Sequence, residues 1–287
     1  MTLRSLEVFL AVVEGGSMRA AAERLYISQP SVSGVVADLE DEYGVRLFER
    51  LGKKLCITQE GEQLAGYARR MLSLNEEIGR QMHCVGKRTP LRIGASVTVA
   101  SSIMAELAGR VQGPSPYVCV ANTGIIEQKI LRNELDVGIV EGHIKSDDLL
   151  VTPMMPDRLV LVCRPDHWCS GRESVHLREL ESERLILREP ESGTRQVLDL
   201  EFQRAGVSMQ VGWECTNSQA ILDAVAAGLG VALMSPRLLC KGMNLVTIPV
   251  SDGPVERWFS LVIHKDKYVG PPLRAFLELC KEYKEHK

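Results

Sequence analysis

Polar side chains that can bind nucleic acid gather in residues 17–33. Glutamine can hydrogen-bond base edges, and serine can bond phosphates or bases. An alanine-rich helix over 18–25, a tight connection and a second helix capped by Ser28 are typical of a helix-turn-helix. We expect the second helix to enter the major groove of duplex DNA with its N-terminus first. The candidate DNA-contacting residues here are Ser17, Arg19, Ser28, Gln29, Pro30, Ser31 and Ser33.

A second group of candidate DNA contacts follows at 44–58, where two short extended pieces flank a Gly-Lys-Lys turn. This pattern predicts a β-wing with a basic tip formed by Arg50, Lys53 and Lys54. Residues 1–60 carry seven basic and nine acidic side chains, so DNA binding would depend on this local cluster. A three-helix protein-interaction module is the alternative interpretation of the same helices.

Four junctions between a predicted strand and the following helix carry small polar residues. In open α/β sheets, ligands bind beyond the carboxyl ends of strands, and free N–H groups at helix starts favour anions. The alternative is that each residue only caps its helix. Arg195 either supplies positive charge to such a site or pairs with a nearby acid. The candidate ligand-binding residues are Ser96, Thr98, Asn122, Thr123, Ser192, Thr194, Arg195 and Asn217.

These two groups need separate scaffolds, and a length of 287 residues predicts two domains. Between them, a helix is expected from Thr58 to about residue 85, roughly 40 Å long. Such a long helix with an apolar heptad stripe favours pairing with a second subunit; packing along its own C-terminal domain is the alternative. The stripe consists of Leu64, Met71, Ile78 and Val85, with Tyr67 and Leu74 at the intervening positions.

After Pro90, short apolar strands alternate with helices, which predicts βαβ units and mostly parallel sheets. The same order of small polar residues, helix and strand occurs twice, and the two strands begin at 136 and 230, 94 residues apart. Two similar lobes are therefore expected. Strands near 158–164 and 258–264 would link the lobes. The other expected strands are 91–95, 117–121, 136–140, 184–188, 211–215 and 230–234, with helices near 100–111, 124–134, 194–205 and 218–228.

Several short motifs occur in order along the first 61 residues. They are F-x-x-V-x-E-x-G-S at 9–17, A-A-x-x-L-x-x-S-Q-P-x-V-S at 21–33, L-E at 39–40, G-x-x-L-F-x-R at 44–50 and T-x-x-G at 58–61. In these motifs the chain resembles the LysR-type transcriptional regulators. The resemblance implies an α/β protein with a winged helix-turn-helix at 1–58, a linker and dimerisation helix at 59–88, and an effector-binding domain at 89–287. That last domain would have the type II periplasmic-binding-protein fold, with lobe I at about 89–161 and 265–287 and lobe II at about 162–264.

Residues 188–195 match R-E-P-x-S-G-T-R, a signature of a subset of that family. The subset includes regulators of sulfur assimilation and carbon fixation. This similarity implies a small oxyanion or carboxylate effector, held by Ser96, Thr98, Thr123 and Thr194. The family resemblance also implies a cytoplasmic, ligand-responsive regulator that binds a pseudo-palindromic site on double-stranded DNA. It would act as a homodimer through the linker helix, or as a homotetramer.

Composition and missing motifs argue against other classes of protein. Hydrophobic residues make up 45% of the chain and charged residues 25%, so disorder is not expected. The formal charge of -3 predicts no general electrostatic attraction to nucleic acid or to acidic membranes. No apolar run approaches the roughly 18 residues that span a bilayer. The usual hydrolase, zinc-protease and nucleotide-binding motifs are missing, so we expect no enzyme activity and no cofactor. The six histidines have no i,i+4 pairing, so no metal site is expected.

The eight cysteines form no C-x-x-C pair, and we expect reduced structural thiols. The alternative is a redox pair, with Cys163 and Cys169 as the closest candidates. A stand-alone solute-binding protein would share the C-terminal fold but would need export, and the sequence predicts no signal for it.

Overall fold

The computed structural model describes residues 1–51, 54–83, 89–240, 242–251 and 255–283. The chain divides into two compact units, Met1–Thr89 and Pro90–Lys287. Each unit has its own hydrophobic core.

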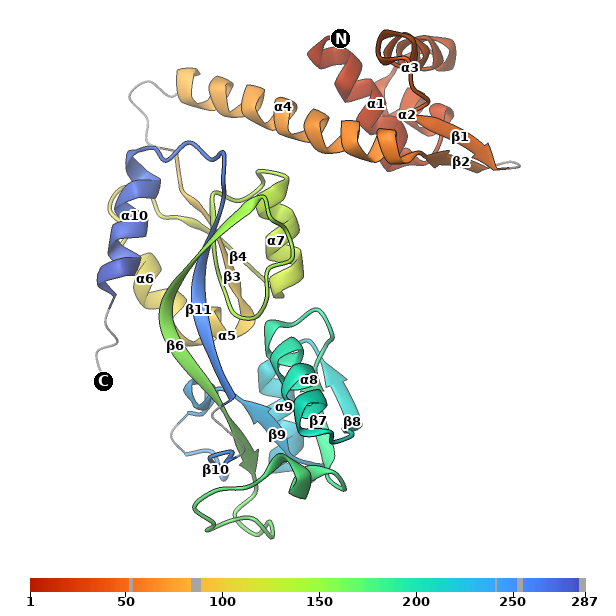
Figure 1. Cartoon of the computed structure of the whole chain (residues 1–287). Coiled ribbons are helices and arrows are strands. Elements are labelled where there is room, and N and C mark those ends of the chain that lie inside the picture. The colour runs from red at the N-terminus through yellow and green to blue at the C-terminus, as the bar shows by residue number, and fades with distance from the viewer. Residues whose placement is uncertain (52–53, 84–88, 241, 252–254, 284–287) are drawn as a thin grey trace. The chain divides into compact units, whose positions relative to one another are not determined.

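The first unit contains three short helices, a β-hairpin and one long helix (Figure 1). The buried side chains of Phe9, Leu39 and Leu47 join α1, α3 and the entry to the hairpin in one core, against which the first turns of the long helix pack. The hairpin strands are antiparallel, with Phe48 opposite Ile57. The elements are α1 (Leu3–Gly15), α2 (Met18–Leu25), α3 (Gln29–Tyr43), β1 (Phe48–Leu51), β2 (Lys54–Ile57) and α4 (Gln59–His83).

Local capping fixes the helix boundaries of this unit, as the sequence predicts. The Ser17 hydroxyl accepts a hydrogen bond from the Ala20 amide at 3.1 Å, and Ser28 accepts one from the Ser31 amide at 3.2 Å. Thr58 Oγ1 accepts from the Gly61 amide at 3.0 Å, which confirms the predicted start of α4. A Cβ added to Gly61 would lie 2.4 Å from the Leu47 carbonyl oxygen, so a glycine is required where α4 meets the chain before β1.

The second unit is built on a mixed sheet of seven strands with the order β10-β6-β11-β5-β3-β4, and β9 pairs with β6. Strands β3, β4 and β5 are parallel, whereas β6 and β11 run antiparallel to each other along most of their length. A separate parallel pair, β7 and β8, lies in the second lobe. The strands are β3 (Arg92–Ser96), β4 (Tyr117–Ala121), β5 (Val137–Val140), β6 (Leu149–Cys163), β7 (Arg184–Arg188), β8 (Gln210–Cys215), β9 (Ala232–Met234), β10 (Val246–Ile248) and β11 (Val255–His264).

Helices cover these strands in both lobes. In the first lobe, α6 and α10 lie on one side of the sheet and α7 on the other (Figure 1). The helix that follows β3 contains a π-helical turn between two short α-helical pieces. The helices are α5 (Val97–Val99), η1 (Ala100–Met104), α6 (Ala105–Gly109), α7 (Thr123–Leu131), η2 (Leu177–Leu180), α8 (Gly193–Ala205), α9 (Ser218–Ala226), η3 (Pro236–Leu238) and α10 (Pro271–Glu282).

The two long strands β6 and β11 differ from the expected short linking strands. β6 begins at Leu149 rather than near residue 158, and it crosses from one lobe to the other together with β11. Leu159 packs in the core of the second lobe, whereas Phe259 packs in that of the first. The chain therefore passes between the lobes within each of these two strands. Each crossing lies before the lobe boundary expected from the sequence, which is between 161 and 162 for β6 and between 264 and 265 for β11. The antiparallel pairing follows because the chain must leave the first lobe on one strand and return on the other.

Candidate nucleic-acid interface and effector site

A hollow of about 680 Å³ on the first unit brings together several of the predicted DNA contacts. Its lining comes from the start of α2, the start of α3 and both hairpin strands. Two of the basic side chains that line it, Arg50 and Lys54, are exposed, and within the described ranges no acidic group pairs with either. The predicted contacts in the lining are Ser17, Arg19, Gln29, Arg50 and Lys54.

All but one of the remaining predicted DNA contacts lie in the first turns of α3 or at its cap. Pro30 and Ser31 are exposed in the first turn of α3. Ser33 accepts a hydrogen bond from Gln29 Nε2 at 3.0 Å, so the two side chains lie on the same face of the helix. Ser28 contacts Ser31 through their hydroxyls at 2.7 Å in addition to its capping role. Lys53 lies outside the described residues.

The long helix α4 exposes part of the predicted heptad stripe. Tyr67, Met71, Leu74 and Ile78 have exposed fractions of 62%, 41%, 56% and 53%. Their spacing of four, three and four residues places them on one face of the helix. Leu64 instead packs against the core of the first unit, and Val85 lies outside the described residues.

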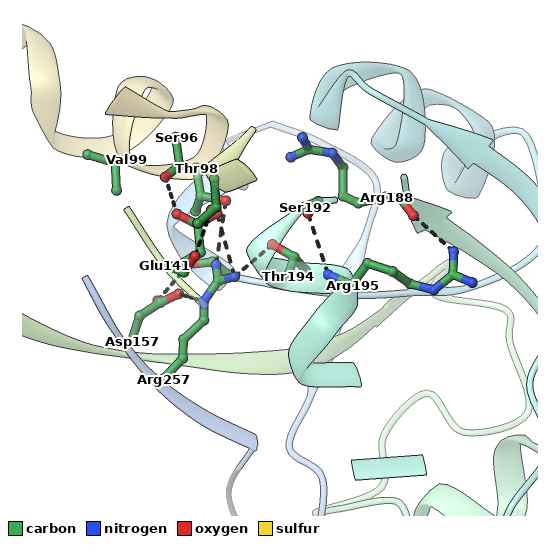
Figure 2. Close-up of polar contacts among 12 residues, drawn as sticks. Ser96, Thr98, Val99, Glu141, Asp157, Arg188, Ser192, Thr194, Arg195 and Arg257 are labelled. Atoms are coloured by element: carbon green, nitrogen blue, oxygen red, sulfur yellow. Dashed lines mark hydrogen bonds and ion pairs between the residues drawn. The ribbon is translucent and has the colours of Figure 1, made fainter. Parts of the chain in front are cut away.

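In the second unit, a buried polar cluster surrounds the guanidinium group of Arg257, on β11 (Figure 2). Its Nε lies 2.7 Å from Asp157 Oδ2 on β6, and its Nη1 donates to Thr194 Oγ1 at 2.7 Å. Its Nη2 lies 3.5 Å from Thr98 Oγ1, and Glu141 Oε1 is 3.7 Å from Nη1. Because Thr98 and Thr194 belong to different lobes, Arg257 links the starts of α5 and α8.

Hydroxyl groups from the ends of neighbouring elements complete this Arg257 cluster. Ser96, at the end of β3, donates to the Glu141 carboxylate, and Thr123, at the start of α7, donates to the Glu141 carbonyl at 2.7 Å. Ser235 donates to Asp157 Oδ1 at 2.7 Å. The carboxyl ends of parallel strands meet at one edge of a sheet, which is why these short side chains converge.

The predicted effector residues fall into two groups. Ser96, Thr98, Thr123 and Thr194 are buried in the Arg257 cluster, with exposed fractions of 1–3%. Three of the other four act as helix caps: Asn122 accepts from the Ile125 amide, Ser192 from the Arg195 amide and Asn217 from the Gln219 amide. For these three residues the hydrogen bonds fit the alternative interpretation, in which the polar residue only caps the start of its helix.

Arg195 pairs with acids rather than entering the Arg257 cluster, and Figure 2 draws it pointing away from Thr194. Its Nε lies 2.8 Å from Asp199 Oδ1, and its Nη1 lies 2.9 Å from Glu214 Oε1. Burial disfavours the charged form, but the hydrogen bonds to the two carboxylates outweigh it and raise the pKa of Arg195. Of the two alternatives left by the sequence, the structure supports pairing with nearby acids.

Sequence reasoning missed the charged members of the Arg257 cluster: Arg257, Asp157 and Glu141. Glu141 directly follows the apolar strand β5, and the strand-end rule used for its neighbours would have found it. Asp157 and Arg257 lie within long strands, 100 residues apart, and no motif marks them. Their pairing depends on the register of β6 and β11, in which the two residues stand opposite each other.

The α8 start and the end of β5 approach each other closely at this site. A Cβ added to Gly193 would lie 1.9 Å from the Glu141 carbonyl oxygen. The S-G-T sequence is therefore needed for packing, because glycine admits the close contact while Ser192 caps the helix and Thr194 reaches Arg257.

Comparison with known proteins gives the same two-part division. A family model described as a bacterial regulatory helix-turn-helix protein of the lysR family matches residues 3–62, and one described as a LysR substrate binding domain matches residues 86–285. The RuBisCO operon transcriptional regulator of Allochromatium vinosum is 33% identical over 97% of this chain and 95% of its own length.

Solved structures of similar proteins share the fold. Full-length CbnR in complex with its target DNA covers 98% of this chain and 99% of its own, with 23% identity and a TM-score of 0.65. The CcmR regulatory domain of Synechocystis PCC6803, in complex with 2-PG, covers 68% of this chain and 96% of its own, with 26% identity and a TM-score of 0.63. Within the described residues, none of the helices has the length and apolar character of a membrane span.

The family resemblance inferred from the motifs is confirmed by these matches. The relatives are transcriptional regulators, so the chain is a regulator and not an enzyme. The chain belongs to the LysR family of DNA-binding transcriptional regulators, with an N-terminal helix-turn-helix domain and a C-terminal effector-binding domain.

Proposed function

We propose that this regulator responds to a small oxyanion or carboxylate that binds in the Arg257 cluster. The observation that carries the proposal is a convergence of donors in a buried position between two lobes. The donors are the Arg257 guanidinium group and the hydroxyls of Ser96, Thr98, Thr123 and Thr194. Hydroxyls and a guanidinium group are the donors that oxyanions and carboxylates accept from. The 2-PG complex of the similar CcmR regulatory domain supports the same class of ligand.

The charges of the Arg257 cluster suggest how such an anion would enter. Glu141 accepts from Ser96 and lies 3.7 Å from Arg257 Nη1, so its carboxylate already occupies donors that the effector needs. We infer that the effector competes with Glu141 for these donors. A ligand that displaces Glu141 would change the contacts between the lobes, and it shifts the protein only if it binds one arrangement more tightly than the other.

The DNA-binding proposal rests on the hollow between α2, α3 and the hairpin. We infer that the start of α3 reads base edges while Arg50, Lys53 and Lys54 contact phosphates. Two copies, paired through the exposed apolar face of α4, would bind a pseudo-palindromic operator as a dimer, or as a tetramer of two dimers. In this proposal residues 1–58 are the DNA-binding domain, 59–88 the linker and dimerisation helix, and 89–287 the effector-binding domain.

The effector proposal is tested by thermal unfolding of the full chain with sulfate, phosphate, 2-PG and a set of small organic acids. For an anion that stabilises the wild type, Thr194→Val removes one hydroxyl of the site and should weaken binding about 10-fold. Glu141→Gln removes the competing negative charge and should strengthen binding. The matched control is Thr247→Val, on β10. If no anion stabilises the protein, or if Glu141→Gln weakens binding as much as Thr194→Val, the proposed site is wrong.

A further inference from the structure

A group of sulfur and nitrogen donors in the second lobe takes no part in the Arg257 cluster. Cys163 is the last residue of β6, and Cys169 lies in the loop that follows, six residues later. Both side chains are fully buried, and their sulfur atoms lie 3.6 Å apart. His167 Nδ1 lies 2.9 Å from the sulfur of Cys169, and the ligand atoms of all three residues lie within 4.8 Å of one another.

Short hydrogen-bonded turns hold the loop that carries these donors. The His167 amide donates to the Arg164 carbonyl at 3.1 Å, and the Ser170 amide donates to the His167 carbonyl at 2.8 Å. At the other end, Cys163 is fixed in the sheet opposite Val246 of β10. The three donors therefore converge because of backbone structure and not through side-chain contacts alone.

The distances suit a cation bound by thiolates. Two sulfur atoms, each about 2.3 Å from a tetrahedral zinc ion, lie about 3.8 Å apart. The observed 3.6 Å separation needs almost no rearrangement. The imidazole ring would have to move away from Cys169 by roughly half an ångström, since a nitrogen and a sulfur on one zinc ion lie about 3.5 Å apart.

Glu183 orients the imidazole ring of His167 for this role. Its Oε2 lies 3.4 Å from His167 Nε2, on the opposite side of the ring from the two sulfur atoms. Metal-binding histidines usually direct their second ring nitrogen at a carboxylate, a backbone carbonyl or a water molecule, which fixes the tautomer and raises the basicity of the ligand nitrogen. The indole of Trp168 donates to the same carboxylate and helps to hold it in place.

A route for an ion leads to the histidine side of this group. A hollow of about 390 Å³ is lined by His167, Glu183 and Gly228, among others. The side chain of His167 is 20% exposed, whereas both sulfur atoms belong to fully buried residues. An ion arriving through the hollow would meet the imidazole first, and a water molecule there can supply a fourth ligand.

Both sulfur atoms belong to fully buried residues, where a thiolate needs a positively charged partner. A bound cation provides one: it stabilises both thiolates directly, and their two protons are released to solvent.

We propose that Cys163, His167 and Cys169 form a three-ligand site for a thiolate-binding d¹⁰ cation, Zn²⁺ or Cu⁺. Two thiolates and one imidazole are the ligands that these ions prefer. The three ligands have the spacing Cys-x₃-His-x-Cys. This spacing contains neither an i,i+4 histidine pair nor a C-x-x-C pair, the two patterns that would predict a metal site from the sequence.

The test uses the full-length protein, reduced and freed of metal with a chelator. Zn²⁺, and separately Cu⁺ without oxygen, is titrated in competition with a chromophoric chelator. One tight equivalent per chain is expected for at least one ion, and Co²⁺ should give a thiolate charge-transfer absorption band. Cys163→Ser and Cys169→Ser should abolish the tight equivalent and the band. The matched controls Cys119→Ser, Cys215→Ser and Cys84→Ser, of which the last follows His83 in the sequence, should keep both.

Two further variants decide the matter if the cysteine variants fail to fold. Glu183→Gln leaves all three ligands in place and should weaken binding about 10- to 100-fold. His167→Asn removes a ligand from a partly exposed position and should weaken it further. The proposal is overturned if the reduced wild type binds neither ion stoichiometrically, or if His167→Asn or Cys169→Ser binds as tightly as the wild type. A Cys163–Cys169 disulfide in air, with no metal binding by the reduced protein, would favour the redox pair instead.

Discussion

Arg257 and Asp157 form a buried ion pair across the two strands that join the lobes. Their closest atoms are 2.7 Å apart, and both side chains are at most 2% exposed. The residues stand opposite each other in the antiparallel ladder of β6 and β11. The link between the lobes therefore contains a charged pair at the position where the proposed effector site lies.

Removing Arg257 should be costly, since Asp157 would keep only the longer contact with Arg237, at 3.4 Å, and the buried Glu141 would lose the guanidinium 3.7 Å away. For Arg257→Met we expect the free energy of unfolding of the full chain to fall by about 3–5 kcal/mol. The control Arg204→Met breaks an ion pair with Glu201 whose arginine is 65% exposed, and should cost at most about 1 kcal/mol. Urea unfolding measures both, and equal losses would contradict the assigned role of the buried pair.

Gln29 and Ser33 should contribute to sequence recognition. When either residue is replaced by alanine, base-edge contacts are lost. We therefore expect binding to an operator fragment selected from genomic DNA to weaken by about 1–3 kcal/mol. Binding to random DNA should hardly change. Gln63→Ala, which alters an exposed glutamine of α4, is the matched control. Equal weakening on specific and random DNA, measured by fluorescence anisotropy, would show that the two residues do not read sequence.

The basic side chains of the hairpin should contribute the electrostatic part of DNA binding. Each of the variants Arg50→Ala and Lys54→Ala loses one phosphate contact. The negative slope of log K for DNA association against log salt concentration should therefore become shallower by about one in each. Lys281→Ala, on α10 of the second unit, should leave the slope unchanged. An unaltered slope in both hairpin variants would exclude this surface from the DNA interface.

The exposed apolar face of α4 should be covered by a second subunit. A charge introduced by Leu74→Glu or Ile78→Glu would be buried without a partner in such an interface, so we expect the dimer to dissociate at micromolar concentrations. The control Gln63→Glu places the same charge on an exposed polar position of α4. Sedimentation equilibrium gives the masses, and an unchanged dimer in both variants would place the interface elsewhere.

Asp136 should make the stability of the second unit depend on pH. Burial opposes its ionisation, but Arg92, at 2.7 Å, and Lys267, at 2.9 Å, outweigh that effect and hold the pKa of Asp136 below its ordinary value of 3.8. The unfolded chain therefore takes up this proton more readily than the folded one. The stabilisation is complete above about pH 4–5 and is lost as the pH falls through the folded pKa.

Asp136→Asn tests this dependence. The variant should be less stable than the wild type at pH 7, and the difference between the two should shrink between pH 5 and pH 2. Asp199→Asn, which alters a 45% exposed carboxylate, should show a smaller difference at pH 7. Urea unfolding across this range measures the effect, and a difference that stays constant with pH would contradict it.

Local sequence determined much of this protein, because helix caps and hydrophobic periodicity act over a few residues. Ser17, Ser28 and Thr58 cap helices where the sequence predicts them, and the alternation of strands and helices after Pro90 appears at nearly the expected positions. Four of the predicted effector residues also meet in the Arg257 cluster. They could be predicted because alternating strands and helices imply a sheet whose strand ends lie at one edge, where ligands bind.

Only the tertiary structure determined which charged residues meet at the site and beside it. Asp157 and Arg257 are 100 residues apart and become partners only through the register of two long strands. Arg195 pairs with Asp199 one turn along the same helix, a contact that helical spacing could have indicated, but its second partner, Glu214, lies on β8. Long-range packing sets the Asp157–Arg257 and Arg195–Glu214 contacts, and no local preference in the chain encodes those two.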